Sequence, residues 1–349
     1  MRLGLILFIF SIINLSCGSE VPEFDGQKAF QNLLDQCDIG PRAPGSLGHL
    51  AGKKYIIESV QDRADTLFLQ NFTYDIYGKE EKFNGTNIIA RFNPLSKEQV
   101  LIGAHWDTRP WADLDKNEEN YNKPILGAND GASGVSILIE LARILKLSPS
   151  SIGINLVFFD AEDSGISGEN ESYCKGSIYF SKNLPLKGIK EGIILDMVGD
   201  KQLSLPIERY SLKFHGELVR KLWDRAKVLD LKAFKGVVAS YIYDDHVPLN
   251  QYAGIPTIDI IDIKYPNSFT NYWHTMDDIP ENCSAESLQQ VGTLMVDYIY
   301  NRKFYNSCVQ GQKQPVHRIQ IHHKESLYQI HIFLCYQIYH MSSLFHHPR

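Results

Sequence analysis

Four short, almost uninterrupted apolar runs limit what this chain can fold into. Each run is followed by polar or turn-forming residues, and none is longer than six residues. Runs of this length are typical of strands that are buried on both faces of a sheet, whereas a buried helix needs about 10 residues or more. We therefore predict strands at residues 99–104, 154–159, 192–195 and 258–263.

Helical patterns separate these runs. In the segment GVSILIELARIL, apolar side chains recur at helical spacing from Val135 to Leu145. A last helix is predicted to begin near Ser284, because serine is a favourable N-cap and an apolar stripe follows it. Strands that alternate with helices predict one α/β domain with a mainly parallel sheet, covered on both faces.

Side chains that can bind a metal ion or transfer a proton follow three of the predicted strands. The first strand runs into His-Trp-Asp, the second into Asp-Ala-Glu-Asp and the third into Asp. Ligands of open α/β sheets bind outside the carboxyl ends of the strands. We therefore expect one edge of the sheet to gather His105, Asp107, Glu162, Asp163 and Asp196.

Two further residues extend this group. Asp130 lies in the glycine-rich segment GANDGASG, where the backbone can approach a site closely, and His274 lies in NYWHTMDD. Taken singly, each residue has a structural explanation as a helix cap, a solvated acid or a hydrogen-bonded histidine. Taken together, two imidazoles and several carboxylates are ligands that zinc accepts, and a neighbouring acid can move protons.

Six motifs occur in the order HWD, GANDGASG, FFDAED, LDMVGD, DDHVPL and WHTMDD. They resemble the zinc-dependent exopeptidase clan of aminopeptidases and, more closely, its bacterial-type glutaminyl-peptide cyclotransferases, the glutaminyl cyclases. The resemblance covers residues 24–305 and implies a zinc-dependent catalytic domain there. It also implies a three-layer α/β/α fold around a central twisted sheet that is mixed but mostly parallel.

The resemblance assigns a role to each matching residue. One zinc ion would be held by Asp130, Asp163 and His274. Glu162 matches the residue that shuttles the proton, and Trp273 matches a wall of the substrate pocket. The remaining matches are two acids of the active-site hydrogen-bond network, Asp196 and Asp244, and two positions that hold a second metal and its partner in two-zinc aminopeptidases, His105 and Asp107.

The implied activity is cyclisation of an N-terminal glutamine of peptides or proteins to pyroglutamate, with release of ammonia. Asp244 and Trp273 favour it, because the aminopeptidases tend to have a small residue and a different neighbour at these two positions. The alternatives are a zinc aminopeptidase with one or two metals, and an inactive peptide-binding lipoprotein. The last would predict missing catalytic groups, yet Glu162 and the three expected ligands are present.

The two ends of the chain differ from the middle. Arg2 precedes a largely apolar run of 13 residues, from Leu3 to Leu15, which is too short to span a bilayer and predicts a signal peptide over residues 1–17. The segment Leu15-Ser16-Cys17 resembles a lipobox, so we expect export to the periplasm or a membrane-anchored lipoprotein. The net charge of −6 argues against a nucleic-acid partner.

The C-terminal segment, residues 306–349, has an unusual composition. It holds seven of the twelve histidines and no clear apolar period. Because a histidine-rich tract is only a compositional hint of metal binding, we expect this tail to lie outside the working fold.

Overall fold

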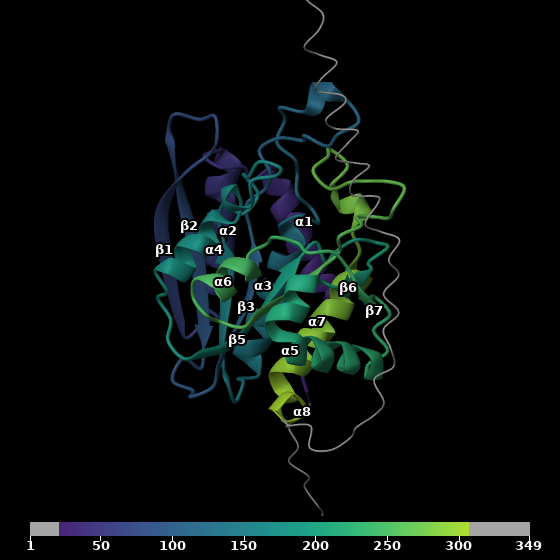
Figure 1. The fold of residues 1–349 in the computed structure, drawn as a ribbon. Coiled ribbons are helices and arrows are strands. Elements are labelled where there is room, and N and C mark those ends of the chain that lie inside the picture. Colours follow the sequence, from purple (N-terminus) through teal and green to yellow (C-terminus); the bar gives the residue numbers. More distant parts are fainter. Residues whose placement is uncertain (1–20, 307–349) are drawn as a thin grey trace, which may run out of the picture. The chain divides into compact units, whose positions relative to one another are not determined.

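A six-stranded mixed sheet organises residues 21–306, the part of the chain that the computed structural model describes (Figure 1). The predicted signal peptide, and all but the first residue of the predicted tail, lie outside these residues. The strand order is β1-β2-β4-β3-β5-β8. The strands are β1 (Thr66–Asp75), β2 (Lys82–Phe92), β3 (Gln99–His105), β4 (Gly153–Phe159), β5 (Ile189–Asp196) and β8 (Thr257–Ile261), and a separate pair consists of β6 (Leu205–Ile207) and β7 (Phe234–Val238).

The centre of the sheet is parallel and one edge is antiparallel. β3 pairs in parallel with β4 and β5, and β5 pairs in parallel with β8. β1 and β2 run antiparallel to each other, and β2 runs antiparallel to β4. The prediction of a mixed, mostly parallel sheet is confirmed. β8 ends before Asp262, whose carboxylate accepts hydrogen bonds from the backbone N–H groups of Ser204 and Lys264 at 2.9 and 3.1 Å.

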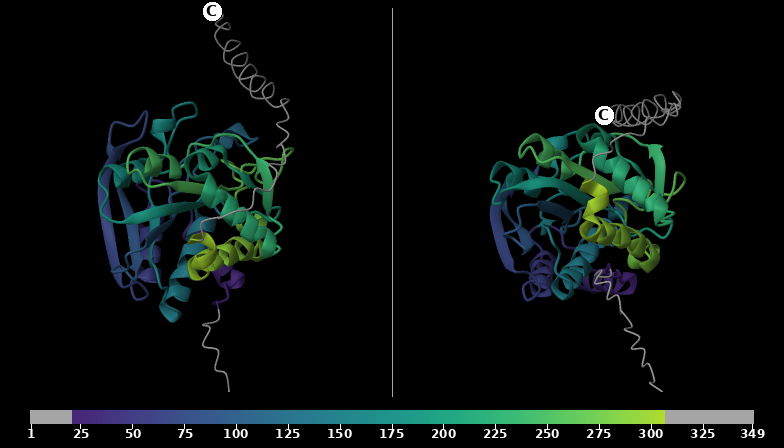
Figure 2. Two further views of the ribbon diagram at one scale, coloured as in Figure 1. Left: turned by 60° about the horizontal axis from the view of Figure 1, so that its bottom comes forward. Right: turned by 90° about the horizontal axis from the view of Figure 1, so that it is seen from below.

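Helices cover both faces of the sheet, so the predicted three-layer arrangement is confirmed. α4 and α6 lie on one face, and the larger helices lie on the other (Figures 1 and 2). The helices are α1 (Gly26–Ile39), α2 (Leu47–Val60), α3 (Ala132–Leu147), α4 (Lys175–Lys182), α5 (Arg209–Val228), α6 (His246–Gln251), α7 (Ala285–Tyr300) and α8 (Arg302–Asn306).

α7 fixes the N-terminal helix to the body of the domain. Its N-cap is Ser284, as predicted, whose hydroxyl accepts a hydrogen bond from the N–H of Ser287 at 3.2 Å. From the same helix, Gln289 bonds the carbonyl of Phe24 at 2.8 Å and the N–H of Gly26 at 2.7 Å. Both views of Figure 2 place α7 beside α1 accordingly. No helix among residues 21–306 is long and apolar enough to cross a membrane.

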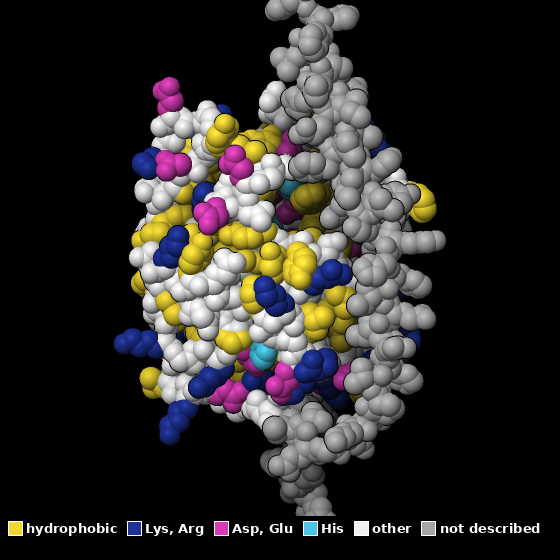
Figure 3. All heavy atoms as spheres, viewed as in Figure 1, with side chains coloured by type: hydrophobic (Ala, Val, Ile, Leu, Met, Phe, Trp, Pro, Cys, Tyr) yellow, Lys and Arg dark blue, Asp and Glu magenta, His cyan; other side chains and the backbone are white. Residues whose placement is uncertain are grey.

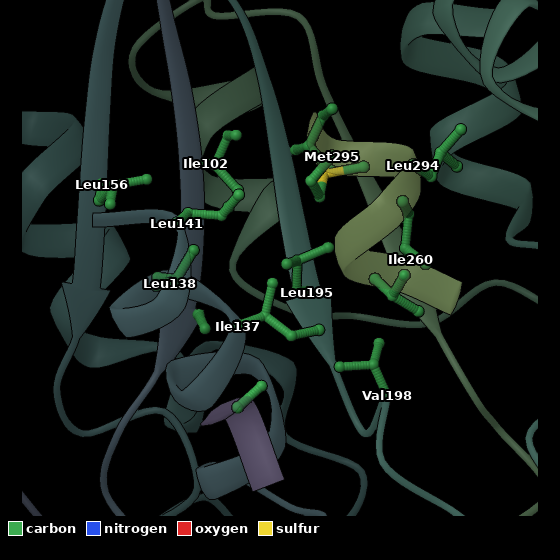
Figure 4. Close-up of a cluster of buried hydrophobic side chains, with 14 of the residues drawn as sticks. Ile102, Ile137, Leu138, Leu141, Leu156, Leu195, Val198, Ile260, Leu294 and Met295 are labelled. Atoms are coloured by element: carbon green, nitrogen blue, oxygen red, sulfur yellow. The ribbon is translucent and has the colours of Figure 1, made fainter. Parts of the chain in front are cut away.

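Alternate side chains of each central strand enter two different cores. In β3, Ile102 faces the larger core with α3 and α7, whereas Leu101 faces the smaller core under α4 and α6. Figure 4 shows Ile102, Leu138 and Met295 among the side chains of the larger core. The strand is buried along its whole length because both faces are covered, which explains its uninterrupted apolar sequence.

We predict that Leu138→Ala lowers the free energy of unfolding by about 2–5 kcal/mol, because it opens a cavity where α3 packs on the sheet. Urea-induced unfolding followed by circular dichroism measures the change. Leu147→Ala, at the exposed C-terminal end of α3, is the matched control and should change stability by less than about 0.5 kcal/mol. Equal losses in the two variants would contradict this assignment of the core.

Candidate active site

The carboxyl ends of the parallel strands deliver the predicted site residues to one place. His105 is the last residue of β3 and Asp196 is the last residue of β5. Glu162 and Asp163 follow β4, and Asp130 lies just before α3. β3 leads through α3 to β4 on one side, and β5 lies on its other side, so a crevice opens at the end of β3. Figure 3 shows a hollow with histidine and acidic side chains at its bottom.

The three expected metal ligands form one buried group. One ligand atom from each of Asp130, Asp163 and His274 lies within 4.8 Å of the other two. His274 Nε2 is 3.2 Å from Asp163 Oδ1 and 3.7 Å from Asp130 Oδ2. The buried atoms Asp130 Oδ2 and Asp163 Oδ2 have no hydrogen-bond partner. Because unpaired buried carboxylate oxygens are costly, this group fits a bound cation.

His105 lies beside this group and forms a second one. Its Nε2 is 3.1 Å from Asp196 Oδ1 and 3.2 Å from Asp130 Oδ1. Burial opposes a charge on His105, but hydrogen bonds with Asp107, Asp130 and Asp196 raise its pKa well above the ordinary value. His105 Nε2 therefore lies between one carboxylate oxygen of Asp130 and one of Asp196.

His274 has the opposite electrostatic character. Burial lowers its pKa below the ordinary value, although Asp163 raises it in part. The neutral imidazole is the form that binds a metal ion. Its backbone φ of 58° is in the left-handed region, which is uncommon outside glycine and is held here by the surrounding structure. The two histidines of the site are therefore not equivalent.

Asp107 positions the acid pair that follows β4. Its carboxylate accepts hydrogen bonds from the N–H of Glu162 at 2.9 Å and from the N–H of Asp163 at 3.2 Å. The preceding Ala161 has a φ of 59°, so the chain turns sharply and directs the two acids apart. Asp107 thus does not line the pocket. It fixes the backbone of Asp163, which is an expected metal ligand.

Two residues that we did not predict hold the metal-binding group. Asp278 accepts hydrogen bonds from the N–H groups of Asn129 and Asp130 at 2.7 and 3.1 Å. Arg109 Nη1 lies 3.2 Å from Asp163 Oδ1. Burial raises the pKa of Asp163, but His274 and Arg109 lower it further, so the pKa is below its ordinary value. Both residues lie close to the motifs that carried the resemblance. The available signal was their position in the sequence: Arg109 follows the HWD motif by two residues, and Asp278 is the last residue of the WHTMDD motif.

The turn before α3 requires glycine. Gly131 has a φ of 101°, and a Cβ atom there would lie 2.7 Å from the carbonyl oxygen of Asp107. No larger residue fits without moving the backbone that positions the acid pair. The glycine-rich motif therefore serves close packing between the ends of β3 and α3.

Three further acids, Glu162, Asp196 and Asp244, line the pocket next to the metal-binding group. Burial raises the pKa of Glu162 well above its ordinary value, and the charges of Asp163 and Asp244 add to this effect. Burial, and then the charge of Asp196, raises the pKa of Asp244 to about 6. Carboxyl groups in this state can accept and return a proton near neutral pH.

The pocket has an aromatic wall. It encloses about 300 Å³ and is lined by seven of the predicted residues, Trp273 among them, together with Tyr173, Tyr243 and Tyr265. The Trp273 side chain is 39% exposed, and its ring centroid lies 3.8 Å from that of His274. The indole therefore covers one side of the expected ligand while facing the pocket. The structure thus brings all nine predicted residues together, seven of them along the pocket.

Comparison with known proteins identifies the family of this chain. Residues 87–299 match Peptidase family M28, a span that contains every residue of the site. The chain therefore belongs to Peptidase family M28.

Solved structures narrow the comparison. The chain is 37% identical to a glutaminyl cyclase of Bacteroides thetaiotaomicron bound to N-acetylhistamine, with a TM-score of 0.77 over 80% of this chain and 99% of that one. It is 36% identical to a glutaminyl cyclase of Tannerella forsythia, with the same TM-score and coverage. It is also 37% identical to a structure described as a leucine aminopeptidase precursor from Bacteroides thetaiotaomicron VPI-5482, with a TM-score of 0.75 over 80% and 98%.

Proposed function

We propose that this chain is a zinc-dependent glutaminyl-peptide cyclotransferase that acts on peptides or proteins with an N-terminal glutamine. The observation that carries the proposal is the convergence of Glu162 and Asp244, whose carboxylate oxygens lie within 4.8 Å of each other in the pocket beside the metal-binding group. Cyclisation transfers a proton between two nitrogen atoms of one substrate, and adjacent acids suit that task. The similarity to two bacterial glutaminyl cyclases supports the same reaction.

The donor set supports zinc as the metal. One imidazole and two carboxylates are ordinary zinc ligands, and a catalytic site leaves a further position open to the pocket. Zinc bound by Asp130, Asp163 and His274 would polarise the side-chain amide carbonyl of the substrate as a Lewis acid.

The protein's own residues then have to fold the substrate and move a proton. The α-amine nitrogen bonds to the side-chain amide carbon, and the bond from that carbon to its amide nitrogen breaks. Glu162 accepts the proton that the amine loses and returns it to the departing nitrogen, which leaves as ammonia. Asp196 and Asp244 accept hydrogen bonds from the two nitrogens, and Trp273 packs against the folded side chain. The nucleophile is already tethered, so no water is needed.

An aminopeptidase activity is the second candidate. His105, Asp130 and Asp196 form another group whose ligand atoms lie within 4.8 Å of one another. A metal there, together with the first, would suit activation of a water for peptide hydrolysis. Against this second activity, Asp130 Oδ1 and Asp196 Oδ1 already pair with His105, whereas two oxygens of the first group, Asp130 Oδ2 and Asp163 Oδ2, have no hydrogen-bond partner. One zinc per chain is therefore expected.

We predict that His274→Ala loses zinc and activity together, while His105→Gln retains about one zinc per chain. The amide introduced by His105→Gln can still donate to the two carboxylates that the imidazole joins, so both keep a hydrogen-bond partner. Metal analysis after gel filtration at one fixed free zinc concentration compares both variants with wild type. Activity of the wild type that rises only with a second zinc equivalent would favour the aminopeptidase.

We predict that Glu162→Gln lowers kcat by about 10²–10⁴ and leaves zinc content unchanged. The amide keeps the shape of the side chain but cannot accept the amine proton, and Glu162 is not one of the expected ligands. Steady-state kinetics with metal analysis measures both quantities. Glu169→Gln, the same change at an exposed position in the same loop, is the control and should retain wild-type activity. Loss of zinc from Glu162→Gln would reassign Glu162 as a ligand.

We predict that the wild-type protein removes ammonia from a peptide that begins with glutamine and releases no leucine from leucine amides. Trp273 and the tyrosines enclose a pocket of about 300 Å³, which suits a folded glutamine side chain. Mass spectrometry of the two product mixtures decides between the candidates. Free leucine, together with an unchanged glutamine peptide, would reject the cyclotransferase in favour of the peptidase.

A further inference from the structure

Cys174 contacts the proposed proton shuttle directly. Its Sγ donates a hydrogen bond to Glu162 Oε1 at 3.3 Å, and within residues 21–306 it is the only group that donates one to this carboxylate. The thiol is completely buried. Sγ, a carboxylate oxygen of Glu162 and one of Asp244 all lie within 4.8 Å of one another. The sulfur therefore lies at the inner side of the proton-transferring acids, away from the bulk solvent.

The backbone of Cys174 is also tied to the acid pair. Its N–H donates to the carbonyl of Glu162 at 2.9 Å, and the N–H of Lys175 donates to the carbonyl of Ala161 at 2.8 Å. Both Cys174 and Ala161 have left-handed φ angles, 54° and 59°. These two hydrogen bonds fasten the loop after β4 to the start of α4, so Sγ and the Glu162 carboxylate are held at a fixed separation.

The position of Cys174 in its helix makes this contact unusual. Cys174 is the N-cap of α4, where a serine, threonine or aspartate side chain would normally accept hydrogen bonds from the first turn. Here the side chain makes no capping hydrogen bond and is directed to Glu162. The Cys174 side chain therefore does not stabilise the first turn of α4 by capping it.

We propose that Cys174 is a positioning residue that orients the Glu162 carboxylate for proton transfer, an inference that rests on the cyclotransferase function proposed above. A shuttle must accept a proton and then release it, so its orienting partner should hold the carboxylate without strongly favouring its charged form. A thiol is a weak hydrogen-bond donor and meets that requirement. Burial and the charge of Glu162 raise the pKa of Cys174 well above its ordinary value, so the sulfur keeps the proton that it donates.

Two substitutions in the full-length, zinc-loaded protein test this role. Cys174→Ala removes the donor and should lower kcat for a glutamine peptide roughly 10-fold with little change in KM. Cys174→Ser restores an O–H donor and should recover kcat to within about 3-fold of wild type. If Cys174 only filled space, the order would be reversed, because a buried hydroxyl without a donor role costs more than a methyl group.

A second background and a control make the result specific. In the Glu162→Gln protein, Cys174→Ala should cause no further loss of kcat, because the two residues act as one unit. Cys37→Ala, a buried cysteine in α1, should keep wild-type kcat. Metal analysis and thermal unfolding confirm that each variant is folded and loaded.

The possible failures are distinguishable. Wild-type kcat in Cys174→Ala, or a serine variant slower than the alanine variant, would overturn the positioning role while leaving the cyclotransferase intact. A wild-type protein that cyclises no glutamine peptide would overturn the proposed function, and this inference with it.

Discussion

The central constraint in this structure is the burial of many carboxylates at one edge of a sheet. Asp107, Asp130, Asp163, Asp196 and Asp244 are all at most 9% exposed. Charged groups of one sign repel each other strongly when water is removed, and each loses its hydration. The surrounding residues must therefore offset both costs, and much of the local architecture follows from how they do so.

Different partners offset the burial of different acids. Backbone N–H groups donate hydrogen bonds to Asp107, the side chains of His274 and Arg109 lie 3.2 Å from Asp163, and His105 pairs with Asp130 and Asp196. Among these five acids, unpaired oxygens remain on Asp130, Asp163 and Asp244, and the first two belong to the group that contains His274. Asp130, Asp163 and His274 therefore form a buried group that fits a bound cation. The acids that stay outside this pairing, Glu162 and Asp244, have raised pKa values and are suited to exchange protons.

The topology of the sheet makes this concentration of acids useful. β3 lies between β4 and β5, and all three end at the same edge. Because the connections on the two sides of β3 diverge, the side chains that follow these strands surround a cavity. The rigid centre fixes the expected ligands, while the loop after β8 brings His274 and Trp273 across the opening. The antiparallel pair β1 and β2 lies at the opposite edge of the sheet from β8.

Much of the fold was predictable because both faces of the central strands are buried. A strand in that environment must be apolar throughout, as in residues 154–159, and this pattern is visible without any tertiary information. β1 was not predicted, because an edge strand alternates exposed and buried residues and has no continuous apolar run. The residues that would carry the chemistry were also named from the sequence, because strand ends, a glycine-rich turn and six ordered motifs marked them.

The sequence by itself determined the fold class, the edge of the sheet where the site lies and the residues that gather there. Only the tertiary structure decided which contacts each of them makes. It separated His105, whose pKa is raised by three neighbouring carboxylates, from His274, whose pKa is lowered by burial and which belongs to the group with unpaired oxygens. It placed Asp107 behind the acid pair, and it revealed Asp278, Arg109 and Cys174 as supporting residues. The physical reason is that a residue type specifies which interactions are available, whereas burial and the partners within about 3 Å, which come from distant parts of the chain, select among them.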